Sequence, residues 1–126
     1  MLRLLFFFLF FSISFEFVHA QCSSGFTEMI IEIVPDSYPA EISWEVTTAG
    51  TVVASGTFEG DTICVDTTLC TTFTIHDTYG DGICCGYGTG YYNIMLDGNI
   101  VATGGEYDYS ESASFYCPVG RSCGNP

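Results

Sequence analysis

Two aspartates four positions apart, Asp77 and Asp81, are the residues of this chain best placed to bind a metal ion. They belong to the segment 77–92, DTYGDGICCGYGTGYY, which holds five glycines, an adjacent pair of cysteines and four tyrosines. Glycine reaches backbone conformations that other residues avoid, so a segment this rich in glycine can form a tightly folded loop. Carboxylates on such a loop can converge on one cation, and oxygen ligands are what calcium prefers. The segment therefore predicts a candidate calcium loop.

The match of this loop to the EF-hand pattern is partial. Asp77, Asp81 and Gly82 fit its first, fifth and sixth positions, but a tyrosine and a glycine stand where the pattern has its third and twelfth ligands. Calcium takes about six to eight oxygens, so another loop has to contribute, and we expect Asp36 to do so. Other candidate acids are Glu41, Glu106, Asp108 and Glu111. The alternative is that Asp77 and Asp81 only hydrogen-bond their own turn.

The tyrosines of the same segment predict a second kind of site. Aromatic rings present flat apolar faces that can stack on sugar rings, which makes Tyr79, Tyr87 and Tyr91 candidate carbohydrate-binding residues. Tyr92 is discounted, because strand alternation places it in the core. The alternative for the loop tyrosines is packing over the neighbouring glycines.

Neither catalysis nor zinc binding is expected. His76 and Asp77 are neighbours on a predicted strand and point to opposite faces, so they cannot act as a base and its orienting partner. The chain has no C-x-x-C motif, and after removal of residues 1–20 only one histidine remains. Zinc sites are built mainly from cysteine and histidine, so this composition disfavours one.

About eight short segments of alternating apolar and polar residues surround the loop. Alternation with a period of two, interrupted by turn residues, indicates an all-β fold, a single antiparallel β-sandwich. The turn Asp97-Gly98 is typical of a type I′ hairpin. The expected strands are 26–34, 41–47, 51–58, 62–65, 70–77, 90–96, 99–103 and 111–117. The expected core contains Ile42, Trp44, Val46, Phe73, Ile75, Tyr92, Ile94 and Phe115.

The first 20 residues have the pattern of a secretory signal peptide. Arg3 precedes an apolar run at 4–15, and small residues suited to cleavage follow. The run is short for a membrane span and is followed by Glu16, so we expect no span after cleavage. The product would be a secreted, extracellular protein with one domain at 21–117 and a C-terminal tail at 118–126.

The charge of the chain is strongly negative. The chain has fifteen Asp and Glu residues and only two Lys and Arg residues, which gives a net charge of −13. Cleavage of the signal peptide would remove one acidic and one basic residue, so the net charge would not change. Such a surface repels nucleic acid and anionic membranes, and it suits cations, cationic partners or an acidic matrix. Solubility in a salty medium is the alternative explanation.

All seven cysteines follow the predicted cleavage site. A secreted domain of this size is expected to pair them in disulfides. The expected pairings are Cys64–Cys70, Cys84–Cys85 and Cys22–Cys117. Cys123 would then be left over, and an oligomer could form through it.

Two segments together resemble a known kind of module. Residues 36–45 follow D-x-Y-P-x-E-x-S-W-E, and residues 77–92 follow D-x-Y-G-D-G-x-C-C-x-Y-G-x-G-x-Y. Both resemble a β-rich module of secreted and surface proteins that has no settled activity, and the segments 64–75 and 96–105 fit the same module. The resemblance implies an accessory extracellular domain.

These observations predict a secreted, non-enzymatic interaction module with a candidate calcium site. Its partner would be an extracellular protein, a glycan or a matrix component. Two alternatives stay open: a lectin-like module that uses the Tyr-rich loop, and an acidic protein associated with a mineral or matrix.

Overall fold

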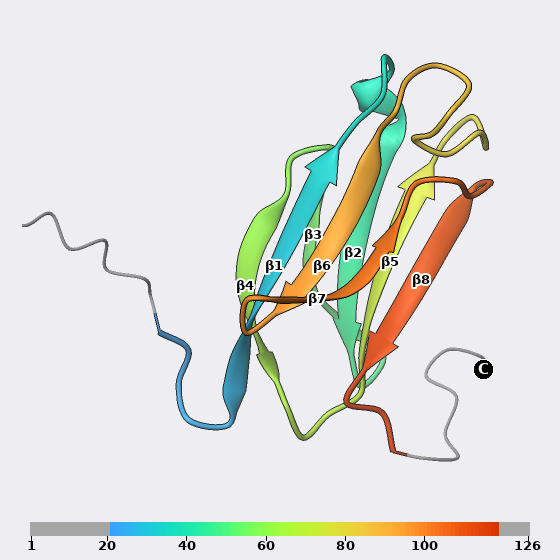
Figure 1. The fold of residues 1–126 in the computed structure, drawn as a ribbon. Coiled ribbons are helices and arrows are strands. Elements are labelled where there is room, and N and C mark those ends of the chain that lie inside the picture. The colour runs from blue at the N-terminus through green and yellow to red at the C-terminus, as the bar shows by residue number, and fades with distance from the viewer. Residues whose placement is uncertain (1–20, 119–126) are drawn as a thin grey trace, which may run out of the picture.

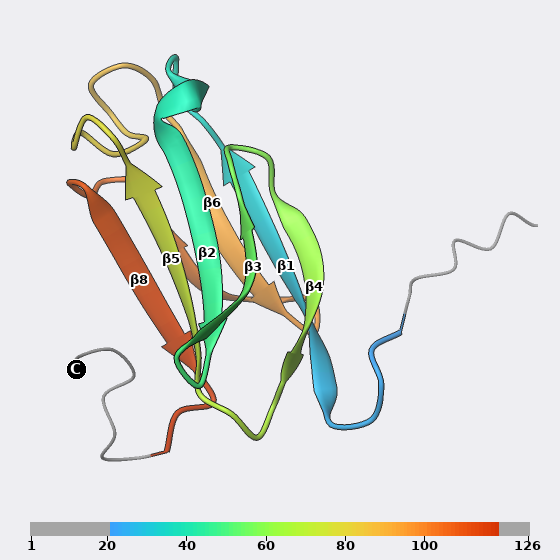
Figure 2. The same cartoon turned by 180° about the vertical axis from the view of Figure 1, so that it is seen from behind.

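The computed structural model describes residues 21–118 as two antiparallel four-stranded β-sheets packed face to face (Figure 1). One sheet has the strand order β4–β1–β6–β7 and the other β3–β2–β5–β8. Figure 2 shows β8, β5, β2 and β3 side by side. The predicted all-β sandwich is confirmed. The predicted signal peptide and residues 119–126 of the predicted tail lie outside the described residues.

The strands agree closely with the alternation in the sequence. The largest differences are at β3 and β8, which end about two residues earlier than expected, within the usual variation of element boundaries. Across residues 21–118, no helix is long and apolar enough to span a membrane. The elements are β1 (Phe26–Val34), the 3-10 helix η1 (Pro39–Glu41), β2 (Ile42–Thr48), β3 (Thr51–Gly56), β4 (Asp61–Asp66), β5 (Thr71–Asp77), β6 (Tyr91–Leu96), β7 (Asn99–Gly104) and β8 (Ser110–Phe115).

The hydrophobic core lies between the two sheets, because alternate side chains of each strand point inward. Seven of the eight predicted core residues are buried, and Phe115 is partly buried against the same cluster. Trp44 is 2% exposed, as expected. Ile83 is fully buried although it belongs to the glycine-rich loop. No alternation marks this residue, so the sequence did not predict it.

The turn between β6 and β7 is the predicted type I′ hairpin. Asp97 and Gly98 have φ values of 53° and 78°, and both central residues of such a turn need positive φ. Ala49 and Gly50, at φ values of 49° and 81°, make a similar turn between β2 and β3. Aspartate and glycine tolerate this region better than most residues, which explains why the first turn was recognisable in the sequence.

The disulfides correct two of the three expected pairings. Cys84–Cys85 is present as predicted, but Cys64–Cys70 and Cys22–Cys117 are wrong. The observed pairs are Cys22–Cys64, with Cα atoms 5.6 Å apart, and Cys70–Cys117, with Cα atoms 4.2 Å apart.

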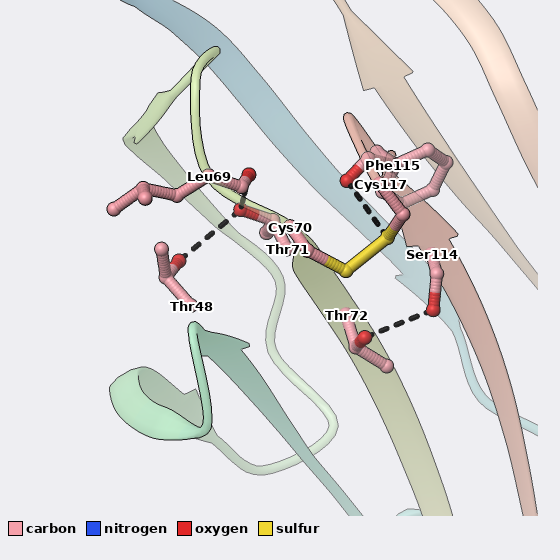
Figure 3. Close-up of a disulfide and its surroundings, with 8 residues drawn as sticks. All are labelled: Thr48, Leu69, Cys70, Thr71, Thr72, Ser114, Phe115 and Cys117. Carbon is pink, nitrogen blue, oxygen red and sulfur yellow. Dashed lines mark hydrogen bonds between the residues drawn. A yellow bond between two sulfur atoms is a disulfide. The ribbon is translucent and has the colours of Figure 1, made fainter. Parts of the chain in front are cut away.

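Sheet pairing explains both corrections. Cys64 lies on β4 opposite Glu28 of β1, so the chain just before β1 reaches it. Cys70 and Cys117 flank the paired ends of β5 and β8, where Thr71 opposes Phe115. In Figure 3 this disulfide lies beside the hydrogen-bonded hydroxyls of Thr72 and Ser114. Cys64 and Cys70 are close in sequence, but Cys64 lies on β4 and Cys70 directly precedes β5, which belongs to the other sheet.

Candidate metal centre

Three carboxylates meet at the end of the sandwich where β2 begins and β5 ends. Glu41 is the last residue of η1, Asp77 is the last residue of β5, and Asp81 lies in the loop that follows. Antiparallel pairing places Ile42 opposite Asp77, which brings Glu41 next to the end of β5. One carboxylate oxygen from each residue lies within 4.8 Å of the other two. Figure 1 shows η1 and the β5–β6 loop together at this end.

Backbone hydrogen bonds hold these elements in place. The backbone N–H and the hydroxyl of Thr78 both donate to the carbonyl oxygen of Glu41, at 3.1 Å each. The N–H of Glu41 donates to the carbonyl of Tyr38 at 3.1 Å, and that of Asp77 donates to the carbonyl of Tyr109 at 2.9 Å. Hydrogen bonds to neighbouring segments therefore fix the backbone that carries Glu41 and Asp77.

The two carboxylate oxygens of Asp77 have different surroundings. Oδ1 accepts hydrogen bonds from the backbone N–H groups of Tyr79 and Gly80, at 2.7 Å each, so Asp77 does hydrogen-bond its own turn, as the alternative to metal binding predicted. Gly80 has a φ of 81°, which favours glycine at this point of the turn. Asp77 is only 3% exposed, and its Oδ2 is buried with no hydrogen-bond partner among the described residues. A buried carboxylate oxygen without a partner is costly, and a cation would satisfy it.

The pKa of Glu41 is raised above its ordinary value. Desolvation is the largest cause, followed by the negative charges of Asp77, Asp81 and Asp36. Both effects disfavour the ionised carboxylate. The geometry thus concentrates negative charge that a bound cation would neutralise.

The other acids considered in the sequence lie differently. Asp36 is outside the group of three: its Oδ1 accepts the backbone N–H of Tyr38 at 2.9 Å, and its charge still contributes to the raised pKa of Glu41. Glu111 accepts a hydrogen bond from the hydroxyl of Tyr92 at 2.8 Å. Glu106 lies instead beside Cys84 and Cys85, whose disulfide leaves no thiolate to bind a metal.

Tyr107 is a neighbour of this centre that the sequence did not reveal. Its hydroxyl oxygen is buried and has no hydrogen-bond partner among the described residues. Burial raises the pKa of Tyr107, and the charges of Asp77, Glu111 and Asp36 raise it further, in that order. The phenol therefore stays protonated and can donate a hydrogen bond. No sequence pattern marks this residue, because it lies outside the predicted strands.

A pocket of about 300 Å³ adjoins the carboxylates. The predicted ligand-binding residues Tyr79 and Tyr87 line it, and Tyr91 is not among the lining residues. Tyr38 was not predicted as a site residue, but it lines the pocket too, and its ring meets that of Tyr87 edge-on, with centroids 5.3 Å apart. Glu41 and Asp81 complete the wall, so the metal cluster and the pocket share two side chains.

The geometry around His76 agrees with the expectation from strand alternation. Asp77 is buried, whereas the His76 side chain is 45% exposed and its Nε2 lies 4.0 Å from Oε1 of Glu45. The two neighbours therefore point to opposite faces, as predicted.

Comparison of the chain with protein-family models, with curated proteins and with solved structures finds no match. The resemblance to a secreted β-rich module therefore stays a prediction from the two sequence motifs.

The raised pKa of Glu41 predicts how the stability of the metal-free protein depends on pH. The native state binds more protons than the unfolded state between the ordinary glutamate pKa of about 4.3 and the higher native value. The free energy of unfolding should therefore fall as the pH rises through this window. Urea unfolding in EDTA at a series of pH values should show that Glu41→Gln flattens this dependence.

Glu59→Gln, which alters an exposed glutamate of the β3–β4 turn, is the control and should leave the pH dependence unchanged. Equal slopes for the wild type and Glu41→Gln would show that the pKa of Glu41 is not raised in the native state.

Proposed function

We propose that this chain is a secreted, non-enzymatic interaction module that binds one calcium ion at the loop end of its β-sandwich. One observation carries the metal assignment: the buried Oδ2 of Asp77, which has no partner among residues 21–118, belongs to a side chain clustered with two other carboxylates. A cation at this point would replace the missing hydrogen bond and offset the repulsion among Glu41, Asp77 and Asp81.

The ligand chemistry favours calcium over other ions. The cluster offers only carboxylate oxygens, which suit hard cations, whereas zinc prefers sulfur and nitrogen ligands. The carboxylates come from η1, from a strand end and from a loop. Calcium accepts such varied geometry, while magnesium demands a near-ideal octahedron and usually retains several waters.

The fold and the disulfides support an extracellular role. Three disulfides link the described cysteines, and such bonds persist in oxidising compartments. The predicted signal peptide agrees with this assignment. The interaction surface in this proposal is the loop end of the sandwich, where the metal cluster and the tyrosine-lined pocket adjoin. Its partner would be an extracellular protein, a glycan or a matrix component.

Calcium should stabilise the protein. Extracellular calcium modules bind with dissociation constants of about 0.1–1 mM. Ligand linkage then predicts that 10 mM calcium raises the free energy of unfolding by about 1.4–2.7 kcal/mol, a shift in Tm of roughly 6–20 °C for a domain of this size. Thermal unfolding in EDTA and in calcium at fixed ionic strength measures the effect.

Matched aspartate variants separate site binding from general screening of charge. Asp81→Asn removes a carboxylate of the cluster and should abolish most of the calcium-dependent shift. Asp97→Asn removes the same charge from the β6–β7 turn, away from the cluster, and should keep the full shift. An unchanged melting curve of the wild type in calcium would refute the metal site. Equal calcium-dependent shifts in Tm for Asp81→Asn and Asp97→Asn would show that calcium only screens the negative charge of the protein.

A further inference from the structure

The tyrosine-lined pocket opens beside the proposed calcium position. Glu41 and Asp81 belong both to the metal cluster and to the pocket wall. Any ion held by the three carboxylates therefore has the pocket on one side. A ligand in the pocket would therefore lie beside such an ion.

The coordination number leaves room for such a ligand. Three carboxylates supply about three oxygens if each binds through one atom and about six if each is bidentate, and calcium takes about six to eight. Asp77 Oδ1 is already used by two backbone N–H groups, which leaves Oδ2 as its available ligand atom. The remaining positions on the ion are left for other oxygens, including those of water or of a ligand.

The rest of the pocket wall is aromatic. Tyr38, Tyr79 and Tyr87 are 47%, 73% and 56% exposed, so their rings are open to a ligand. The carbonyl of Tyr87 accepts the backbone N–H of Ser37 at 3.2 Å, which ties the two loops that carry these rings. Large aromatic groups left exposed around a concave wall favour a ligand with an apolar face.

We propose that this pocket binds a neutral saccharide through the calcium ion. Two adjacent hydroxyls of one sugar ring complete the coordination of calcium, and a C–H face of the ring packs on the tyrosines. This inference rests on the proposed calcium site and names the class of its ligand. The pocket volume of about 300 Å³ is at the small end of ligand sites, which suits a single terminal sugar residue.

The negative charge of the protein favours a neutral ligand over an anionic one. The net charge of −13 repels carboxylate, sulfate and phosphate groups, so acidic sugars and acidic side chains are disfavoured as oxygen donors to the ion. An alkylammonium ligand would pack on the same tyrosines and pair with Glu41 and Asp81, but it would compete with calcium for these carboxylates. Calcium dependence therefore distinguishes the two ligands.

The experiment uses terbium as a luminescent substitute for calcium in the purified protein, with methyl glycosides of mannose, glucose, galactose and fucose as probes. Nearby tyrosines sensitise the terbium emission, and its lifetime reports the waters on the ion. At least one glycoside should remove about two coordinated waters, since its two hydroxyls replace them. The same glycoside with all hydroxyls methylated keeps its apolar face and should have no effect. In calcium, NMR titration of that glycoside should show binding that EDTA abolishes.

Two tyrosine variants test the aromatic wall. Tyr79→Ala removes an exposed pocket ring and should weaken glycoside binding by about three- to tenfold, while the calcium-dependent shift in Tm stays as in the wild type. Tyr91→Ala removes an exposed ring that does not line the pocket, and it should leave both measurements unchanged.

The possible failures are distinguishable. If the wild type shows no calcium-dependent shift in Tm, the calcium site itself is wrong. If the shift is present but no glycoside of the panel binds, the saccharide inference alone is overturned. Binding that persists in EDTA or in Asp81→Asn would refute the metal bridge. Displacement of calcium by tetramethylammonium would identify a site for organic cations instead.

Discussion

Replacing Trp44 by alanine is expected to lower the free energy of unfolding by about 3–5 kcal/mol, the range found when a large buried aromatic side chain is removed. Trp44 is 2% exposed and lies on β2 between Ile75 of β5 and Gly56 of β3. A Cβ atom at Gly56 would lie 2.6 Å from the indole ring, so the ring packs directly on that backbone. Its Nε1 also donates a hydrogen bond to the carbonyl of Glu59 at 2.9 Å.

Urea unfolding followed by far-UV circular dichroism measures this loss without relying on the tryptophan itself. Trp44→Phe retains part of the ring volume but loses the hydrogen bond, and it should fall between the wild type and Trp44→Ala. Val53→Ala on β3 is the surface control: the side chain is 54% exposed, so we expect a change within about 0.5 kcal/mol. A loss below about 1 kcal/mol for Trp44→Ala would show that the core is not organised around this residue.

Removing the Cys70–Cys117 disulfide with the double substitution Cys70→Ser and Cys117→Ser is expected to cost about 4 kcal/mol. The two cysteines are 47 residues apart in sequence, and opening a loop of this length increases the conformational entropy of the unfolded chain. The midpoint of urea unfolding should decrease, whereas the native β3–β2–β5–β8 sheet should persist because β5 and β8 stay paired through their backbones.

The second long-range disulfide provides a matched comparison. Cys22 and Cys64 are 42 residues apart, so the same entropic argument predicts a nearly equal loss when both are replaced by serine. Unchanged unfolding midpoints would show that these bonds do not form. Peptide mapping of the non-reduced protein should recover Cys22–Cys64 and Cys70–Cys117, and recovery of Cys64–Cys70 would contradict the sheet pairing described above.

The strand register explains how Glu41, rather than Asp36, joins Asp77 and Asp81 in the metal cluster. Sequence motifs placed Asp77 and Asp81 together because they are four positions apart on one glycine-rich loop. Glu41 is 36 positions before Asp77, and it comes close only because Ile42 pairs with Asp77 across β2 and β5. A different register between β2 and β5 would place another residue, in place of Ile42, opposite Asp77.

The sequence by itself determined the local features of this protein. Alternation of apolar and polar residues located the eight strands and placed Trp44 in the core, because side chains of a strand alternate whatever its partner. Asp97-Gly98 predicted its own turn, since that conformation depends mainly on the two residues themselves. The adjacent Cys84 and Cys85 were paired correctly for the same reason, as no long-range contact decides their proximity.

Only the tertiary structure decided which distant segments meet. The pairing of β4 with β1 and of β5 with β8 set the two long-range disulfides, and the pairing of β2 with β5 set the third carboxylate of the cluster. Strand alternation contains no information about the neighbouring strand, because every strand of a sandwich offers the same backbone hydrogen-bonding groups. The choice of neighbour comes from the packing of the whole core, and the candidate site lies where those neighbours end.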